Sequence, residues 1–240
     1  MLFGIFALIW HDFNIWQQID VFGNIPHGPL AVVAGIVEIA AGFALFIPKT
    51  ARAGALVLAI LYGIFALLWI PVYAQKPTYN AIGNIFEQLS MVSGALMIYA
   101  ALSPEHRSRR LATIAYYLFA VSVVSFTLEQ ALYLDGTASF VPKWIPPSGM
   151  FWAVATTVFF GLAAVALLIR RYALLAAQLT ALMIAGFQVL VWLPAPFAQS
   201  TLLSWAGNAE NLGILASALI VAGYLSNQAQ MGMRESIAVL

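Results

Sequence analysis

Cysteine is absent from this chain of 240 residues, and charged residues are scarce. Without cysteine the chain has no disulfide, no thiol redox catalyst and no thiolate ligand for a metal or an iron–sulfur cluster. Only 8% of the residues are charged, whereas soluble domains carry about 25%. The net charge of +1 provides no field that would recruit nucleic acid. These absences exclude an ordinary soluble protein, a disordered chain and a nucleic-acid-binding protein.

Apolar residues instead make up 63% of the chain, and they gather in runs that approach the ~20 residues a membrane span needs. Seven runs are bounded by proline, glycine or charge, as helix ends are: 30–47, 53–72, 85–102, 111–132, 151–169, 173–193 and 212–225. The last is extended at its start by residues 207–211. An eighth run, 1–10, is half as long and lacks the basic start and the cleavage site of a signal peptide. The sequence predicts an all-α membrane protein with eight segments, the first of them short.

Basic residues favour one side of the membrane. With the N-terminus inside, the inner loops and tail hold eight Lys and Arg residues, and the outer loops hold only Lys76 and Lys143. Because basic short loops stay in the cytoplasm, we expect a bacterial or archaeal inner-membrane protein with both termini cytoplasmic. All seven Trp residues fall on the outer side, where an aromatic belt is the simpler interpretation. The long outer loops 11–29 and 133–149 predict that any site opens outward.

The two halves of the chain match at an offset of 123 residues. Residues 68–71 (LWIP) pair with 191–194 (VWLP), and 87–89 (EQL) pair with 210–212 (ENL). Because each half has an even number of helices, the halves point the same way about a pseudo-two-fold axis along the membrane normal. We predict two parallel four-helix bundles, residues 1–102 and 111–225, joined by a basic cytoplasmic linker, 103–110, and followed by a cytoplasmic tail, 226–240.

Several motifs fall within these two halves. They are Asp12-Phe13 followed by Trp16-Gln17, Glu38-x-x-x-Gly42-x-x-Leu45, Phe126-x-x-Glu129 and the loop 141–146 (VPKWIP). Over nearly the whole chain this pattern resembles the DoxX/DoxD-like family of integral membrane proteins, here as a tandem of two four-helix units. Relatives commonly carry Glu-His where this chain has Glu129-Gln130. The resemblance implies an accessory subunit of a quinone-linked oxidoreductase complex, with other membrane subunits and the lipid bilayer as partners.

Glu38 is the deepest charged residue in a predicted span, where it costs roughly 2.5–3.5 kcal/mol on insertion scales. Its helical neighbours are small: Ala31, Ala34, Gly35, Ala41 and Gly42. Such a stripe lets another helix approach closely, so Glu38 is predicted to face protein and not lipid. Two interpretations stay open, a structural hydrogen bond and a proton-handling or ligand-binding carboxyl.

Further polar residues gather near the outer boundary. Glu87 and Glu210 are predicted to open their helices, where capping of free N–H groups is the simpler interpretation. Capping needs only one polar residue, whereas here neighbouring amides share a helix face with each carboxyl. The candidate ligand-binding or proton-handling residues, besides Glu38, are His11, Asp12, Asn84, Glu87, Gln88, Glu129, Glu210 and Asn211. We expect Glu87 to matter more than Glu210, because its half also carries His11, Asp12 and Glu38.

No catalytic, cofactor or metal signature completes this picture. No span offers an axial histidine for haem, and the glycine-rich motifs of flavin and nucleotide sites are missing. Oxygen and nitrogen ligands at His11, Asp12 and Glu87 lack a His-x-x-x-His pair, so no metal site is predicted. The cofactor stays unknown. Three functions remain: an accessory redox subunit that binds quinone or lipid in an outward-facing pocket, a transporter of protons or a small solute, and a structural subunit of a larger complex.

Overall fold

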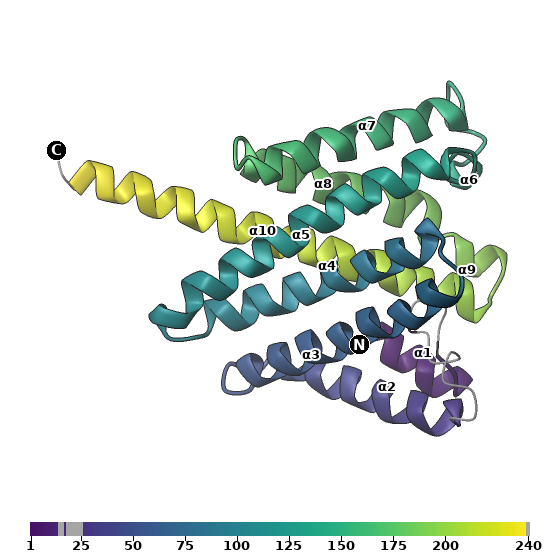
Figure 1. Cartoon of the computed structure of the whole chain (residues 1–240), viewed down its shortest axis with the longest axis horizontal. Coiled ribbons are helices and arrows are strands. Elements are labelled where there is room, and N and C mark those ends of the chain that lie inside the picture. Colours follow the sequence, from purple (N-terminus) through teal and green to yellow (C-terminus); the bar gives the residue numbers. More distant parts are fainter. Residues whose placement is uncertain (14–16, 18–25, 239–240) are drawn as a thin grey trace.

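A computed structural model describes residues 1–13, 17 and 26–238, and every regular element over them is a helix. The all-α prediction is therefore confirmed for this part of the chain. The elements, drawn in Figure 1, are α1 (Leu2–Trp10), α2 (His27–Ala44), α3 (Ala51–Gln75), α4 (Tyr79–Ala101), α5 (Glu105–Leu132), α6 (Leu134–Phe140), α7 (Gly149–Leu168), α8 (Ala173–Phe187), the π-helical turn η2 (Gln188–Trp192), α9 (Ala195–Ala198) and α10 (Leu202–Ala238).

Seven helical segments in the described residues are long and apolar enough to cross a membrane. They lie in α2, α3, α4, α5, α7, the run from α8 to α9, and α10. Their outward faces are apolar: Val33, Ile36 and Phe43 of α2 are each more than half exposed. Such faces belong in lipid, so the protein is an integral membrane protein. Helix α1 has nine residues, and an eighth span and the side that each terminus faces stay predictions.

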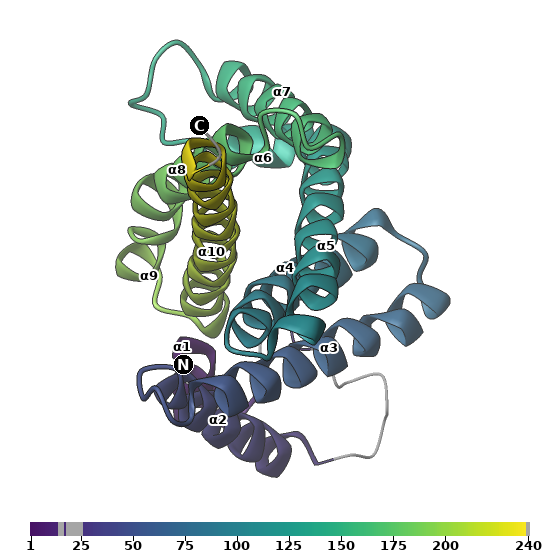
Figure 2. The same ribbon diagram turned by 90° about the vertical axis from the view of Figure 1, so that its left-hand side faces the viewer.

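The long helices run side by side along the longest axis of the molecule (Figure 1). Helices α4 and α10 lie at the centre and pack against each other (Figure 2). Helix α3 packs against α4, and α8 packs against α10. The first helix of each half reaches across to the other half, because α1 packs against α10 and α5 packs against α4. We call the end that carries α6 and α9, at the right of Figure 1, the α6–α9 end.

Two helices extend beyond their apolar cores. Helix α5 begins at Glu105 after Pro104, so most of the predicted linker 103–110 is helical. Helix α10 begins at Leu202, five residues before the predicted extension at 207, and continues to Ala238 through the predicted tail. Short helices, α6 and α9, also form within loops predicted to lie on the outer side. Hydropathy marks the part of a helix that meets lipid, whereas polar turns at its ends stay helical without that signal.

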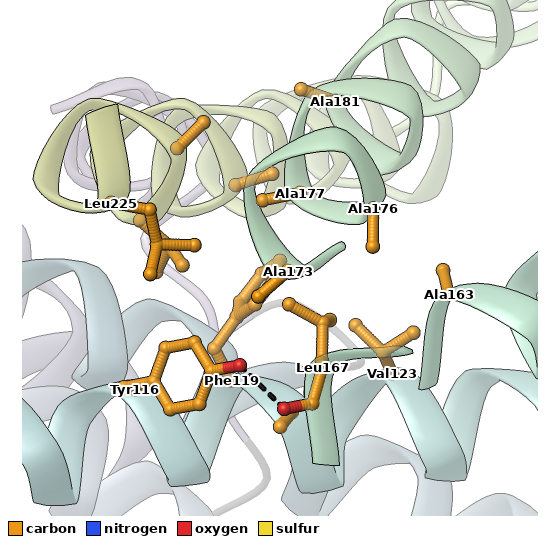
Figure 3. Packing of buried hydrophobic residues seen from close by; sticks show 14 of the residues in the cluster. Tyr116, Phe119, Val123, Ala163, Leu167, Ala173, Ala176, Ala177, Ala181 and Leu225 are labelled. Atoms are coloured by element: carbon orange, nitrogen blue, oxygen red, sulfur yellow. Dashed lines mark hydrogen bonds between the residues drawn. The ribbon is translucent and has the colours of Figure 1, made fainter. Parts of the chain in front are cut away.

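The core of the second half is built from small residues around a few aromatic rings (Figure 3). Tyr116 and Phe119 of α5 are fully buried beside Leu167 of α7 and Ala173 and Ala177 of α8. The Tyr116 hydroxyl donates to the Leu167 carbonyl at 2.5 Å, in the last turn of α7, where carbonyls lack regular helical partners. The alanines let α8 approach closely, as small residues do between helices in membranes.

Candidate functional site

Helix α8 ends in the π-helical turn η2, in which the Leu193 N–H donates to the Gln188 carbonyl at 2.7 Å. A π turn and the prolines that follow it leave backbone carbonyls without their usual donors. Pro196 stands four residues after Trp192 and has no N–H for the Trp192 carbonyl. Asn208 of α10 supplies the missing donor, because its Nδ2 donates to that carbonyl at 2.9 Å.

The other amides of this interface complete a buried network between α8, η2 and α10. Gln188 Nε2 donates to Asn208 Oδ1 at 2.7 Å. Asn211 Nδ2 donates to Gln188 Oε1 at 2.8 Å and to the Ile184 carbonyl at 3.1 Å. The network positions the indole of Trp192 against Gly207, where a Cβ atom would overlap the ring. Trp192 and the first turns of α10 are thereby held together at the α6–α9 end.

Beside this network lies a cavity of about 330 Å³. Residues of α4, α5, α6, α8 and α10 provide most of its wall. Its polar groups belong to Asn80, Glu87, Glu129, Gln130, Tyr133, Thr137, Glu210 and Asn211. Its aromatic groups belong to Phe126, Phe140, Phe160, Phe187 and Trp192. We call this space the carboxyl chamber.

Three glutamates from three helices meet in the carboxyl chamber. The Glu210 side chain forms a carboxyl–carboxyl hydrogen-bond contact with Glu87, and Glu129 interacts electrostatically with both. Glu210 is only 4% exposed, and its Oε1 atom has no hydrogen-bond partner among the described residues. The Glu129 carboxylate lies directly against Gly83 of α4, where a Cβ atom would overlap it, and it interacts with Asn80.

The charge of this cluster has no protein counter-ion in the chamber wall. No Lys, Arg or His lines the chamber among the residues that the structure describes. Removing a carboxylate from water is costly unless an opposite charge or hydrogen bonds compensate it. Protons or a bound cation must therefore neutralise part of the negative charge.

A second, apolar space of about 260 Å³ adjoins the first. The two spaces share wall residues Gln130, Thr137, Phe140, Phe187 and Trp192. Beyond that wall the second space is lined by Val141, Pro142, Ile145, Trp152, Thr156, Leu190 and Val191. We call it the apolar chamber. The pair of chambers offers polar groups at one end and an aliphatic and aromatic surface at the other.

The structure brings part of the predicted set together. Glu87, Glu129, Glu210 and Asn211 all line the carboxyl chamber. The capping interpretation of Glu87 and Glu210 is wrong, because neither helix has an acidic residue in its first turn. Helix α4 begins at Tyr79, and α10 begins at Leu202, so each glutamate stands two turns inside its helix.

Other predicted residues lie elsewhere. His11 and Asp12 are exposed and do not line the chamber, and Asp12 Oδ1 accepts a hydrogen bond from the Phe13 N–H at 2.8 Å. Asn84 and Gln88 are buried outside it; Asn84 Nδ2 donates to the Asn80 carbonyl at 2.7 Å. The partners of Glu87 in the chamber thus come from the second half of the chain, and not from the half that carries His11 and Asp12.

Glu38 occupies a separate buried position in the first half. It is 1% exposed, which confirms that it faces protein, and Gln17 Nε2 donates to its Oε1 atom at 2.6 Å. The small-residue stripe of α2 receives α1, since a Cβ atom on Gly35 would crowd the Gly4 carbonyl. Tyr62 of α3 interacts with both Glu38 and Glu210, but neither Glu38 nor Tyr62 lines the carboxyl chamber.

Sequence reasoning missed the amide network and the aromatic wall. Gln188 is a polar residue inside the predicted span 173–193, four residues before the Trp192-x-Pro194 motif, and this position was a usable signal. The aromatic residues carried no signal, because phenylalanine is ordinary in any apolar helix. Among the described residues no group of three or more His, Asp or Glu side chains is arranged to hold a metal ion.

Comparison of the chain with protein-family models, with curated proteins and with solved structures finds no match in any of the three. The DoxX/DoxD-like resemblance therefore rests on the sequence motifs alone.

Proposed function

We propose that this integral membrane protein binds a small amphipathic molecule across the two chambers at the α6–α9 end. The observation that carries the proposal is the shared wall between a chamber rich in carboxyl and amide groups and a chamber lined by apolar side chains. A ligand with a polar head and an apolar body matches both spaces at once. Ligand sites are commonly apolar cavities with a few convergent polar groups.

The head group provides most of the discrimination in such a site. A ligand that enters from the bilayer moves its tail from lipid to protein, so that tail gains little hydrophobic free energy. Its head meets fixed polar groups. Gln130 is oriented by two hydroxyls, because its Oε1 atom accepts from Thr156 at 3.1 Å and from Thr157 at 3.3 Å. This arrangement leaves the Gln130 amide N–H groups to donate to a ligand.

The sequence resemblance suggests a quinone or a lipid as the ligand, and an accessory role in a membrane redox complex. A quinone carbonyl accepts hydrogen bonds of the kind that an amide donates. Transport of protons or a small solute is the second candidate, and the meeting of three carboxyls on α4, α5 and α10 favours it. Nothing in the two chambers favours a purely structural role.

The predicted repeat gains support from contacts on the α4–α10 interface. At the offset of 123, Glu87 is equivalent to Glu210, and Gly94 is equivalent to Ser217. Each pair meets: the two glutamates are in contact, and a Cβ atom on Gly94 would overlap Ser217. Equivalent residues touch each other only beside a two-fold axis. We infer that a pseudo-two-fold axis runs between α4 and α10 and that the carboxyl pair lies on it.

Native mass spectrometry of the protein released from nanodiscs tests the proposed function. Thr137→Trp places an indole at the shared wall, and Thr113→Trp places the same side chain at an exposed position on α5. We expect wild type and Thr113→Trp to retain added decylubiquinone or a co-purified lipid, and Thr137→Trp to lose it. Equal adducts on all three proteins, or none on any, would contradict the two-chamber site.

A further inference from the structure

We propose that the head of the bound molecule is an organic cation, an ammonium or phosphonium group, held by the carboxyls of the carboxyl chamber and faced by its aromatic rings. The inference rests on the proposed two-chamber site and names the class of its ligand. It follows from three features of the chamber: its charge, its aromatic wall and its size.

The carboxyls of the chamber favour a ligand that carries a positive charge. Glu210 lines the chamber together with Glu87 and Glu129, and its buried Oε1 atom has no hydrogen-bond partner among the described residues. Lys76 lines a neighbouring hollow beside Asn80, but it does not line the carboxyl chamber. A ligand that brings its own positive charge therefore meets two or three carboxyls with no competing side-chain cation.

The aromatic wall and the size of the chamber select an organic cation over a metal ion. The rings of Phe126 and Phe160 have centroids 5.9 Å apart, and those of Phe160 and Phe187 are 6.2 Å apart, so three rings form one continuous wall. Phe140 and Trp192 form a second pair at 5.9 Å. Aromatic faces attract quaternary ammonium groups, whose weak hydration makes burial cheaper than for a small ion. A space of about 330 Å³ is also far larger than a bare ion needs.

Protons compete with such a ligand for the same oxygens. The ionisable groups that line the chamber are Glu87 of α4, Glu129 of α5, Tyr133 beyond the end of α5, and Glu210 of α10. Tyr62 of α3 interacts with Glu210 from outside the chamber. Because deprotonated carboxyls bind a cation and protonated ones do not, affinity for a cation should rise with pH, whereas affinity for a neutral molecule should not.

The experiment compares two molecules of the same shape. Benzyltrimethylammonium carries a positive charge, and neopentylbenzene is its neutral isostere. Binding of both, and of decylubiquinone, is measured by thermal shift and calorimetry on the full chain in nanodiscs, at several pH values. The variants are Glu129→Gln and Glu210→Gln in the chamber. Glu38→Gln is the matched control, because it makes the same change at a buried glutamate outside the chamber.

We expect the cation to bind wild type at least about tenfold more tightly than its isostere, with the gap widening as pH rises. Both chamber variants should lose about tenfold in cation affinity, and Glu38→Gln should keep it. The wild-type comparison stands even where a variant fails to fold, and melting curves identify such a variant.

Each other outcome overturns a definite statement. If the two isosteres bind equally, or if Glu38→Gln loses as much cation affinity as the chamber variants, the proposal of a cationic head group is wrong. The two-chamber site would still stand. If decylubiquinone is the one molecule of the three that binds, the cationic head group is also wrong and the ligand has a neutral head group. If none of the three molecules binds wild type, both the cation and the proposed function fail.

Discussion

The amide network at η2 makes a quantitative prediction about Asn208. This side chain is almost fully buried and forms two interhelical hydrogen bonds, accepting from Gln188 and donating to the Trp192 carbonyl. Asn208→Ala removes both bonds and leaves the buried Gln188 amide and the part-buried Trp192 carbonyl without these partners, and Pro196 has no N–H to offer that carbonyl. The substitution should therefore destabilise the junction of η2 and α10.

The magnitude follows from the two lost bonds. Hydrogen bonds between helices in a membrane contribute ~0.6 kcal/mol on average and up to ~1.7 kcal/mol each. A buried polar group left without a partner costs about 1–3 kcal/mol. We expect Asn208→Ala to lower the free energy of unfolding by about 1–3 kcal/mol, which for a chain of this size lowers Tm by about 2–12 °C.

Thermal melting in nanodiscs at one fixed scan rate measures the effect. Gln228→Ala is the control, because Gln228 is exposed and its side chain only donates to the Tyr224 hydroxyl in the same helix, at 2.6 Å. Its Tm should stay within about 2 °C of wild type. A double variant with Gln188→Ala should lose less than the sum of the single losses, because the two residues share a hydrogen bond.

A wild-type melting temperature for Asn208→Ala would refute this reasoning. It would mean that the Trp192 carbonyl finds another donor, and that the network does not hold α10 against η2. Additive losses in the double variant would likewise show that Gln188 and Asn208 do not act as a pair.

Three further predictions concern other parts of the molecule. Gly35→Ala should lower the free energy of unfolding by about 1–3 kcal/mol, and so lower Tm, because its new methyl group would overlap the backbone carbonyl of Gly4, whereas Gly63→Ala, with open space around it, should leave Tm unchanged or raise it. Glu38→Gln should melt within about 2 °C of wild type, and Glu38→Lys should yield little folded protein by size-exclusion chromatography, since an unpaired buried charge costs roughly 3–5 kcal/mol. Cysteine introduced at Ser200 should react with an impermeant thiol reagent added outside intact cells, and cysteine at Ser108 should not; the reverse pattern would invert the predicted topology.

The sequence alone was sufficient for seven of the eight predicted membrane segments and for the burial of Glu38. Both depend on local patterns: an apolar run of sufficient length marks a span, and small residues one turn either side of Glu38 mark a helix–helix contact. Because these signals lie within a few turns of a single helix, no knowledge of the other helices is needed to interpret them. The structure accordingly shows Glu38 almost fully buried, with α1 on its small-residue stripe.

Helix ends and the π turn depended on tertiary partners. Residues 202–206 (LLSWA) lie before the predicted helix start at 207, yet they form the first turn of α10. Two amides in the turns that follow bond across the interface, Asn208 to η2 and Asn211 to α8. Hydropathy along one segment cannot register a partner that another helix provides.

The carboxyl chamber was decided by packing alone. Glu87, Glu129 and Glu210 stand on three helices, separated in sequence by 42 and 81 residues (87 to 129 and 129 to 210). The sequence showed that each is a costly polar group in an apolar setting, but the choice of neighbours was set by α5 packing against α4 and by α4 packing against α10. A single helix determines which of its faces is polar, and only the arrangement of several helices determines which polar faces meet around one cavity.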